Sequence, residues 1–296
     1  GDEKAAKKKL KELESEAWEH FLDMTISQAI LWAATNVSPE ERASEIAAAE
    51  PYFIGSQSGA SGAWVSGPKD LAPPEYFWGY ENMSTVKGLF MAGDASGANP
   101  HKFSSGSCTE GRLAGKSAIR FLVKEKPSMP SVDAAEMEKA KATILQPLKT
   151  YEENKDKSTD PNVNPHYILP KMFMLRLQKL MDEYAGGVSM RFTTTEPLLK
   201  RGLELLAMLK EDAAKLGAKD VHDLMRAWEN THRMYQAEAH VRSILFRQET
   251  RWPGYYFRAD KPRLDEENWK VFVNCRMDPK TEQWEMKKVP VRTTFA

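Results

Sequence analysis

The stretch that decides the fold is residues 86–116, VKGLFMAGDASGANPHKFSSGSCTEGRLAGK. A turn feeds a short apolar run that ends at Gly93-Asp94, and a loop then leads into a helix over 108–123. A strand ending in Gly-Asp lets the backbone approach a ligand closely, and the carboxylate can accept a hydrogen bond from a sugar or ribitol hydroxyl. The Ser/Gly run at 104–107 offers hydroxyls and free backbone N–H groups at a helix start, which suits an anion or an electron-rich carbonyl. A capped helix after a strand explains the same pattern equally well.

The sequence on either side divides into helical and irregular parts. Residues 3–50 place apolar side chains at three- and four-residue steps, which predicts helix, and the glycines of 54–67 predict an exposed loop. In the helix over 108–123, Leu113 and Leu122 are among the positions expected to face inward. The remaining predicted elements are helices over 132–153, 165–185, 194–217 and 219–249, and two strands, 269–276 and 283–291, around a turn at 278–281.

Composition limits the possible functions. The chain has 296 residues, typical of about two structural units, and its 42 Lys+Arg balance its 42 Asp+Glu. A neutral chain has no field to attract nucleic acid or an anionic membrane, and no run is long and apolar enough for a transmembrane segment. Cys108 and Cys275 form neither a disulfide framework nor a metal or iron–sulfur site, so a reducing, cytoplasmic setting is expected. The lysine-rich start is not a signal peptide, and the chain is expected to be a piece of something longer.

The central stretch resembles a known family. The run GLFMAGDASGANPHKFSSGSCTEGRLAGK is similar to the second flavin-binding segment of the fumarate reductase/succinate dehydrogenase flavoprotein superfamily. The resemblance is specifically to the alpha subunits of dissimilatory adenylylsulfate (APS) reductases in three places: HKFSSGS within this run, SGAWVSGPKDLAP before it, and the tail from 247 to 291. The resemblance implies part of an α/β FAD-binding domain followed by a mainly α-helical C-terminal domain with a small terminal β-hairpin.

The resemblance also implies a domain division. The family binds FAD mainly through an N-terminal G-x-G-x-x-G turn, which is absent here, so the chain resembles only the C-terminal half and would hold one wall of the flavin site. The expected parts are the end of the capping domain (1–50), the second segment of the FAD-binding domain (51–124), the helical domain (125–249) and the tail with its hairpin (250–296).

The cofactor implied by the resemblance is FAD. Gly93 and Asp94 match the family's contact with the ribitol–phosphate part of FAD. The helix-start turn that faces the flavin pyrimidine ring in the family is matched by Ser105, Gly106, Ser107 and Cys108. A turn aspartate and a purely capping run remain the alternatives for these positions.

The catalytic residues implied by the resemblance lie beside this turn. Lys102 stands where fumarate reductases place a catalytic arginine and could hold a sulfite or sulfate oxygen. His101 is a candidate for anion contact or proton transfer. Gln57 replaces a histidine expected in the family's GSHSG string, and it can hydrogen-bond an oxyanion but carries no proton or charge. Phe103 is expected to line the nucleotide pocket. A surface lysine, a structural histidine and ordinary packing are the alternatives.

The implied reaction is the two-electron reduction of adenylylsulfate to sulfite and AMP, or the reverse, through a flavin N5–sulfite adduct. Electrons would come from an iron–sulfur beta subunit, because this chain lacks the cysteines for clusters. The missing N-terminal half of the same subunit is the other expected partner. The alternatives are a fumarate reductase or succinate dehydrogenase of the same superfamily, and a non-catalytic assembly fragment.

Three further patterns complete the expectations. Glu249 and Arg251 lie in RQETRW, which resembles a family string that ties the helical domain to the flavin domain, and both are expected to be structural. His232 and His240 lie eight apart on one helix without a third ligand, so no metal site is expected. The tail aromatics could contact the iron–sulfur partner or pack in the core; they are Trp252, Tyr255, Tyr256, Trp269 and Trp284.

Overall fold

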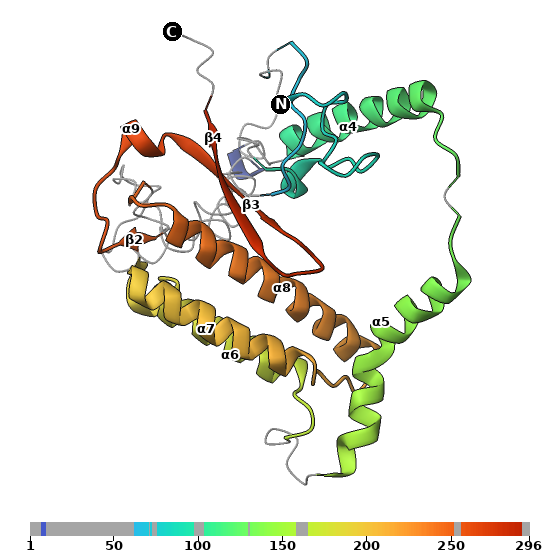
Figure 1. Cartoon of the computed structure of the whole chain (residues 1–296), viewed down its shortest axis with the longest axis vertical. Coiled ribbons are helices and arrows are strands. Elements are labelled where there is room, and N and C mark those ends of the chain that lie inside the picture. The colour runs from blue at the N-terminus through green and yellow to red at the C-terminus, as the bar shows by residue number, and fades with distance from the viewer. Residues whose placement is uncertain are drawn as a thin grey trace.

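The structure is a computed structural model (Figure 1). It describes residues 7–9, 62–70, 72, 76–97, 104–129, 131–157, 165–251 and 256–291, without the side chains of residues 104 and 105. Most of the helical segment expected over 3–50, and with it the expected end of the capping domain, lies outside the described residues.

Three helices form the main core. They are α6 (Pro170–Tyr184), α7 (Glu196–Ala213) and α8 (Val221–Phe246), and they pack against one another. Their apolar stripes meet around side chains that are almost completely buried, including Phe173, Leu199, Leu206 and Val241. The Asp220 carboxylate caps α8 by accepting a hydrogen bond from the Asp223 N–H at 2.8 Å. The sequence prediction of these helices is confirmed, although each is shorter than expected.

Helix α5 (Ala134–Asn154) joins this core only through its second half. Asp133 caps its start by accepting from the N–H groups of Ala135 and Glu136. Residues 134–146 are all exposed, and the helix reaches α8 where the Trp228 indole N–H donates to the Ile144 carbonyl at 3.0 Å. Figure 1 shows α5 leading away from the three-helix core towards the linker that follows α4.

The tail forms the expected hairpin. Strand β3 (Val271–Met277) pairs antiparallel with β4 (Trp284–Pro290), and the short helix α9 (Glu266–Trp269) precedes it. The Asp278 carboxylate accepts from the N–H groups of Lys280 and Thr281 and closes the turn. A second, parallel pair joins β1 (Thr193–Thr194) to β2 (Phe257–Arg258).

The expected α/β portion of the FAD-binding domain is not evident in the described residues. Over 62–97 they form isolated bridges, such as Met83 with Phe90 and Ala63 with Ser96, and a 3-10 turn, η2 (Gly93–Ala95). The short strand expected before Gly93 is reduced to the single bridge of Phe90 with Met83, which follows a turn at Gly88 with a φ of +86°. A parallel sheet needs several strands with crossover connections, and this part of the chain does not contain such a set.

Helix α4 (Ser104–Glu125) follows and begins earlier than the predicted residue 108. Its buried face consists of Ala114, Ser117 and Phe121. Leu113 and Leu122 are 38% and 57% exposed, so the expectation that both face inward is wrong. They lie off the narrow stripe that the segment 62–97 covers.

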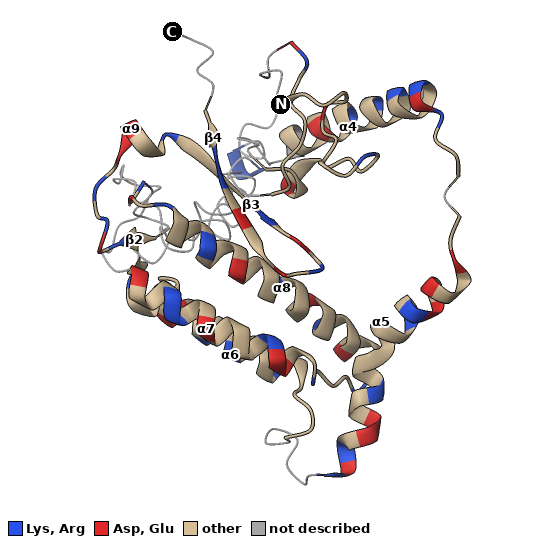
Figure 2. Cartoon of the chain, viewed as in Figure 1, with Lys and Arg blue, Asp and Glu red and all other residues tan. Residues whose placement is uncertain are grey.

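Charges of both signs alternate over the surface of α5, α6, α7 and α8 (Figure 2). Many form ion pairs one turn apart, for example Lys200 with Glu196 and Arg226 with Glu229. Such exposed pairs contribute at most about 1 kcal/mol each. None of the helices described has the apolar length that a membrane span requires.

Candidate functional site

The Gly93-Asp94 turn packs directly against the start of α4. Gly93 is buried and has a φ of +61°, a backbone conformation that favours glycine. A Cβ added to Gly93 would lie 3.2 Å from the Ser107 Oγ and 3.5 Å from its Cβ. The missing side chain therefore lets the turn and the first part of α4 come together.

Glu110 holds this turn in place. Its Oε2 accepts hydrogen bonds from the Gly93 N–H at 2.8 Å and from the Ser96 hydroxyl at 2.7 Å. Ser96 is 1% exposed, and its Oγ also lies 3.0 Å from the Gly93 carbonyl oxygen. Sequence reasoning missed Glu110. The available signal was its position three residues after Ser107, which puts both side chains on one face of the helix.

The described end of the glycine-rich loop lies against the same turn. Ala63 donates its N–H to the Ala95 carbonyl, and Gly97 donates to the Ala63 carbonyl, both at 2.8 Å. A Cβ on Gly62 would be 2.5 Å from the Ser96 carbonyl carbon, and one on Gly97 would be 2.9 Å from the Gly62 oxygen. The two backbones are thus closer than any side chain allows, and the glycines are needed for that approach.

The structure brings together only some of the expected site residues. Gly93 contacts Ser107; Gly106 and Ser107 are half-buried, whereas Asp94 and Cys108 are exposed. Ser105 lies in the first turn of α4, but its side chain is not described. Lys102, His101, Gln57 and Phe103 lie outside the described residues, so their roles remain predictions.

The start of α4 carries the partial positive charge of a helix N-terminus. The first four N–H groups of a helix have no partner within the helix, and the helix dipole places partial positive charge there. Gly106 and Ser107 lie in this first turn, beside the Gly93-Asp94 turn. This arrangement can hold a group on which negative charge develops.

A metal centre has no support in the part of the chain that is described. It contains no group of three or more His, Cys, Asp or Glu side chains that could hold a metal ion. His232 and His240 are both exposed on α8, and Cys108 and Cys275 are free thiols on the surface.

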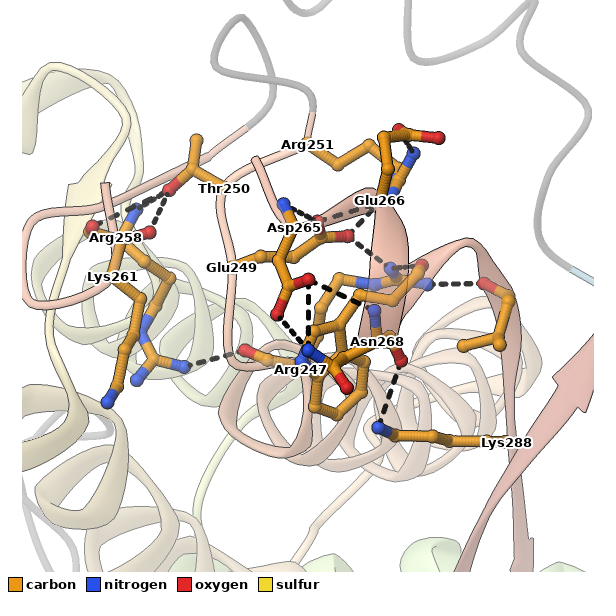
Figure 3. A network of polar contacts seen from close by, with 12 residues as sticks. Arg247, Glu249, Thr250, Arg251, Arg258, Lys261, Asp265, Glu266, Asn268 and Lys288 are labelled. Atoms are coloured by element: carbon orange, nitrogen blue, oxygen red, sulfur yellow. Dashed lines mark hydrogen bonds and ion pairs between the residues drawn. The ribbon is translucent and has the colours of Figure 1, made fainter. Parts of the chain in front are cut away.

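A second polar cluster surrounds Glu249, whose side chain is fully buried (Figure 3). The carboxylate accepts from the Arg247 Nη1 at 2.6 Å, from the Arg251 Nε at 2.7 Å and from the Asp265 N–H at 2.8 Å. Arg251 also pairs with Glu266. Among the described residues, this cluster joins Arg247 at the end of α8 to Arg251 and Asp265 of the tail. The link to the flavin domain that the resemblance implies stays a prediction.

Beside it, Arg258 and Asp260 join the ends of two helices. The fully buried Arg258 guanidinium donates to Asp260 and to the Ile244 carbonyl at 2.8 Å, near the end of α8. Asp260 in turn accepts from the Glu196 N–H at 3.1 Å, at the start of α7. The hydrogen bonds from Arg258 lower the pKa of the Asp260 carboxyl to about 2. A cation at one helix C-terminus and an anion at the other N-terminus both match the helix dipoles.

Three of the five tail aromatics lie in the described residues, and all three pack within the chain. Trp269 is buried and stacks beneath the Lys288 ammonium, 3.5 Å from the ring centroid, which supports a role in packing. Trp284 is half-buried next to Arg242, and Tyr256 packs against the helical core. Trp252 and Tyr255 lie outside the described residues.

Comparison with known proteins finds a matching family model and a close relative in sequence. Residues 174–296 match the family model described as the fumarate reductase flavoprotein C-terminus. The chain is 48% identical over 288 residues to the adenylylsulfate reductase subunit alpha of Megalodesulfovibrio gigas, an alignment that covers 95% of this chain and 43% of that protein.

Solved structures give the same relationship. The chain superposes on adenylylsulfate reductase from Archaeoglobus fulgidus with a TM-score of 0.82 and 51% identity, over 97% of this chain and 45% of that one. The same scores and coverage relate it to an adenosine-5-phosphosulfate reductase solved in complex with sulfite as a covalent adduct. Residues 174–296 therefore resemble the C-terminal part of fumarate reductase flavoproteins, and the chain is similar to adenylylsulfate reductase alpha subunits over nearly its whole length and less than half of theirs.

Proposed function

We propose that this chain is part of the FAD-binding alpha subunit of an adenylylsulfate reductase. The whole subunit would reduce adenylylsulfate to sulfite and AMP with two electrons, or run the reverse reaction. One observation carries the proposal: Glu110 and Ser107 hold the Gly93-Asp94 turn against the start of α4, in a chain that is 48% identical to such a subunit. A relative with 51% identity is known with sulfite bound covalently.

The described residues fit one wall of a flavin site. Gly93 has no side chain to separate the turn from α4, and the exposed Asp94 carboxylate can accept a hydrogen bond from a ribitol hydroxyl. Ser105, Gly106, Ser107 and Cys108 would present the first turn of α4 to the electron-rich end of the ring. When bound, the flavin would supply the two-electron redox chemistry.

The residues proposed for the sulfo group act by position and charge. Lys102 would hold a sulfo oxygen with its ammonium, as a cation stabilises an oxyanion. His101 would contact the anion or move a proton, and Gln57 would donate a hydrogen bond without supplying either charge or a proton. Phe103 would line the nucleotide pocket. Each would orient the substrate more than react with it.

We also propose that the rest of such a subunit packs on the outer face of α4. Ile119, Leu122 and Val123 are each more than half exposed on that face. A Cβ added to Gly111 or Gly115 would meet nothing within 4 Å, so this side of the helix is open to another backbone. The expected division into residues 1–50, 51–124, 125–249 and 250–296 belongs to this proposal, and an iron–sulfur beta subunit would deliver the electrons.

Flavin spectroscopy tests the proposed function. The chain joined to the rest of its subunit should purify with FAD absorbance, and added sulfite should bleach that absorbance. The same complete subunit should form AMP from adenylylsulfate when a reductant and the partner subunit are present. Lys102→Ala should lower the rate of AMP formation by about 10²–10³, while the surface variant Lys87→Ala should not. A complete subunit without flavin would favour the assembly fragment instead.

A further inference from the structure

The Glu110 carboxylate lies at the junction of the two halves of the proposed flavin wall. Side chains on a helix point back towards its N-terminus, so Glu110 reaches the level of Ser107 and the turn that begins at Gly93. It accepts the Gly93 N–H at 2.8 Å and the Ser96 hydroxyl at 2.7 Å. Glu110 is itself only half-buried, yet it satisfies a buried amide and a buried hydroxyl.

These two bonds fix the placement of Asp94. Ser96 donates its own N–H to the Gly93 carbonyl at 3.0 Å, which closes the turn, and Glu110 fastens the closed turn to α4. Asp94 projects from this turn, whereas Gly106 and Ser107 belong to the helix. The distance between the carboxylate of Asp94 and the first-turn amides of α4 therefore depends on Glu110.

We propose that Glu110 is a positioning residue of the flavin site, which sets the Gly93-Asp94 turn against the start of α4 without touching the flavin. This inference rests on the proposed function. Glu110 acts through its geometry, because both of its bonds are to groups of the turn. Losing the carboxylate leaves the Gly93 N–H and the Ser96 hydroxyl without this acceptor and frees the turn to shift.

A glutamine variant separates the hydrogen-bonding geometry of Glu110 from its charge. Both donors bind the same carboxylate oxygen, Oε2. In Glu110→Gln, the amide oxygen placed at that position can still accept both the Gly93 N–H and the Ser96 hydroxyl. The glutamine variant thus retains the connections and removes the charge, whereas Glu110→Ala removes the connections as well.

Glu125 provides a matched control. It lies at the other end of α4 and ties the helix to the same segment of chain, accepting from the Tyr80 hydroxyl at 2.9 Å and the Lys87 ammonium at 3.1 Å. Glu125→Ala therefore loosens α4 at a place that has no contact with the Gly93-Asp94 turn. A merely structural effect would appear in both alanine variants.

The test measures flavin and sulfite affinity in the complete subunit with its partner. Glu110→Ala should weaken FAD binding about tenfold or more, equivalent to about 1.4 kcal/mol. It should also weaken sulfite binding, which is measured by the bleaching of the flavin absorbance. Glu110→Gln and Glu125→Ala should match the wild type. Equal FAD and sulfite affinities in Glu110→Ala and the wild type would overturn the proposal, as would a Glu110→Gln variant as weak as Glu110→Ala.

Two further outcomes keep the result decisive. If Glu110→Ala does not fold, Ser96→Ala replaces it: weaker FAD binding supports the proposal and unchanged binding overturns it. A wild-type subunit that binds no flavin refutes the proposed function itself. A wild type that binds flavin, with an unaffected Glu110→Ala, refutes only the role of Glu110.

Discussion

Replacing Glu249 with glutamine changes a single atom of the side chain, but it should strongly reduce the stability of the tail and of the end of α8. The carboxylate is fully buried, and each of its two oxygens accepts two hydrogen bonds. One oxygen serves Arg247 and the Arg251 Nε; the other serves the Arg251 Nη2 and the Asp265 N–H. An amide nitrogen donates hydrogen bonds and does not accept them. In either orientation of a glutamine, its N–H₂ group would therefore face two of the donors that the carboxylate satisfies.

The expected cost follows from the burial of the two arginines. The Arg247 and Arg251 side chains are 13% and 21% exposed, so they cannot regain full hydration when the carboxylate charge is removed. Breaking a buried ion pair by removing one partner costs about 3 to 5 kcal/mol. Glu249→Gln should therefore lower the free energy of unfolding by about that amount.

Urea unfolding followed by far-UV circular dichroism measures this cost, with Glu266→Gln as the control. Glu266 pairs with the same Arg251, but its side chain is 52% exposed, so the loss should stay below about 1 kcal/mol. The midpoint should fall for Glu249→Gln with little change in the slope. If the two variants lose similar stability, the buried carboxylate does not organise the cluster and the reasoning fails.

Three further variants probe other parts of the structure. Arg258 lowers the pKa of Asp260 from 3.8 to about 2, so the ion pair stabilises the folded chain above pH 3.8 and ceases to do so as the pH falls towards 2. Asp260→Asn should therefore lower the free energy of unfolding by up to about 2 kcal/mol at neutral pH. A variant that unfolds in acid with the same profile as the wild type would contradict this. Gly93→Ala should lower the melting temperature of the chain, at a cost of about 1 to 2 kcal/mol, while Gly115→Ala in the open face of α4 should leave it unchanged or raise it; equal melting temperatures would show that the positive φ of Gly93 is not needed. Ile119→Glu should reduce co-purification with the rest of the subunit but leave the chain's own unfolding within about 0.5 kcal/mol of the wild type, and unchanged co-purification would place the docking face elsewhere.

Local patterns predicted the helices but not their ends. The 3.6-residue periodicity of apolar side chains reveals α6, α7 and α8 because the packed face of a helix is written into its own sequence. The helix expected over 194–217 begins only at Glu196, because Thr193 and Thr194 pair with Phe257 and Arg258. Such pairing across more than sixty residues leaves no mark in a local window.

The candidate site shows the same limit. A glycine before an aspartate at the end of an apolar run indicates a close approach, and Gly93 is indeed buried in a left-handed conformation. The spacing of Glu110 and Ser107 indicates a shared helix face, but it does not reveal the partners of Glu110, which lie 17 and 14 residues earlier in a turn without a fixed pattern. The resemblance supplied the flavin and the substrate, which no local pattern specifies.

The terminal hairpin connects the candidate site to the helical core. Neighbouring residues of a strand face opposite sides. Phe272 in β3 packs against Trp64 of the glycine-rich loop, with ring centroids 5.9 Å apart. On the other face of the hairpin, Lys288 lies over Trp269, next to the Glu249 cluster, and Figure 1 shows the strands passing between α8 and the segment around α4.

This connection makes the Glu249 cluster relevant to the flavin wall. Arg247 donates to the Trp269 and Val271 carbonyls at 2.8 and 2.7 Å, so the end of α8 fixes the first residue of β3. Phe272 is the next residue, and it contacts the loop that lies against the Gly93-Asp94 turn. A shift of the hairpin in Glu249→Gln should therefore reach the turn, and flavin affinity in the complete subunit should fall even though Glu249 lies outside the proposed site. If Glu249→Gln lowers the free energy of unfolding by about 3 to 5 kcal/mol and leaves the flavin affinity unchanged, the Gly93-Asp94 turn is held by Glu110 and α4 alone.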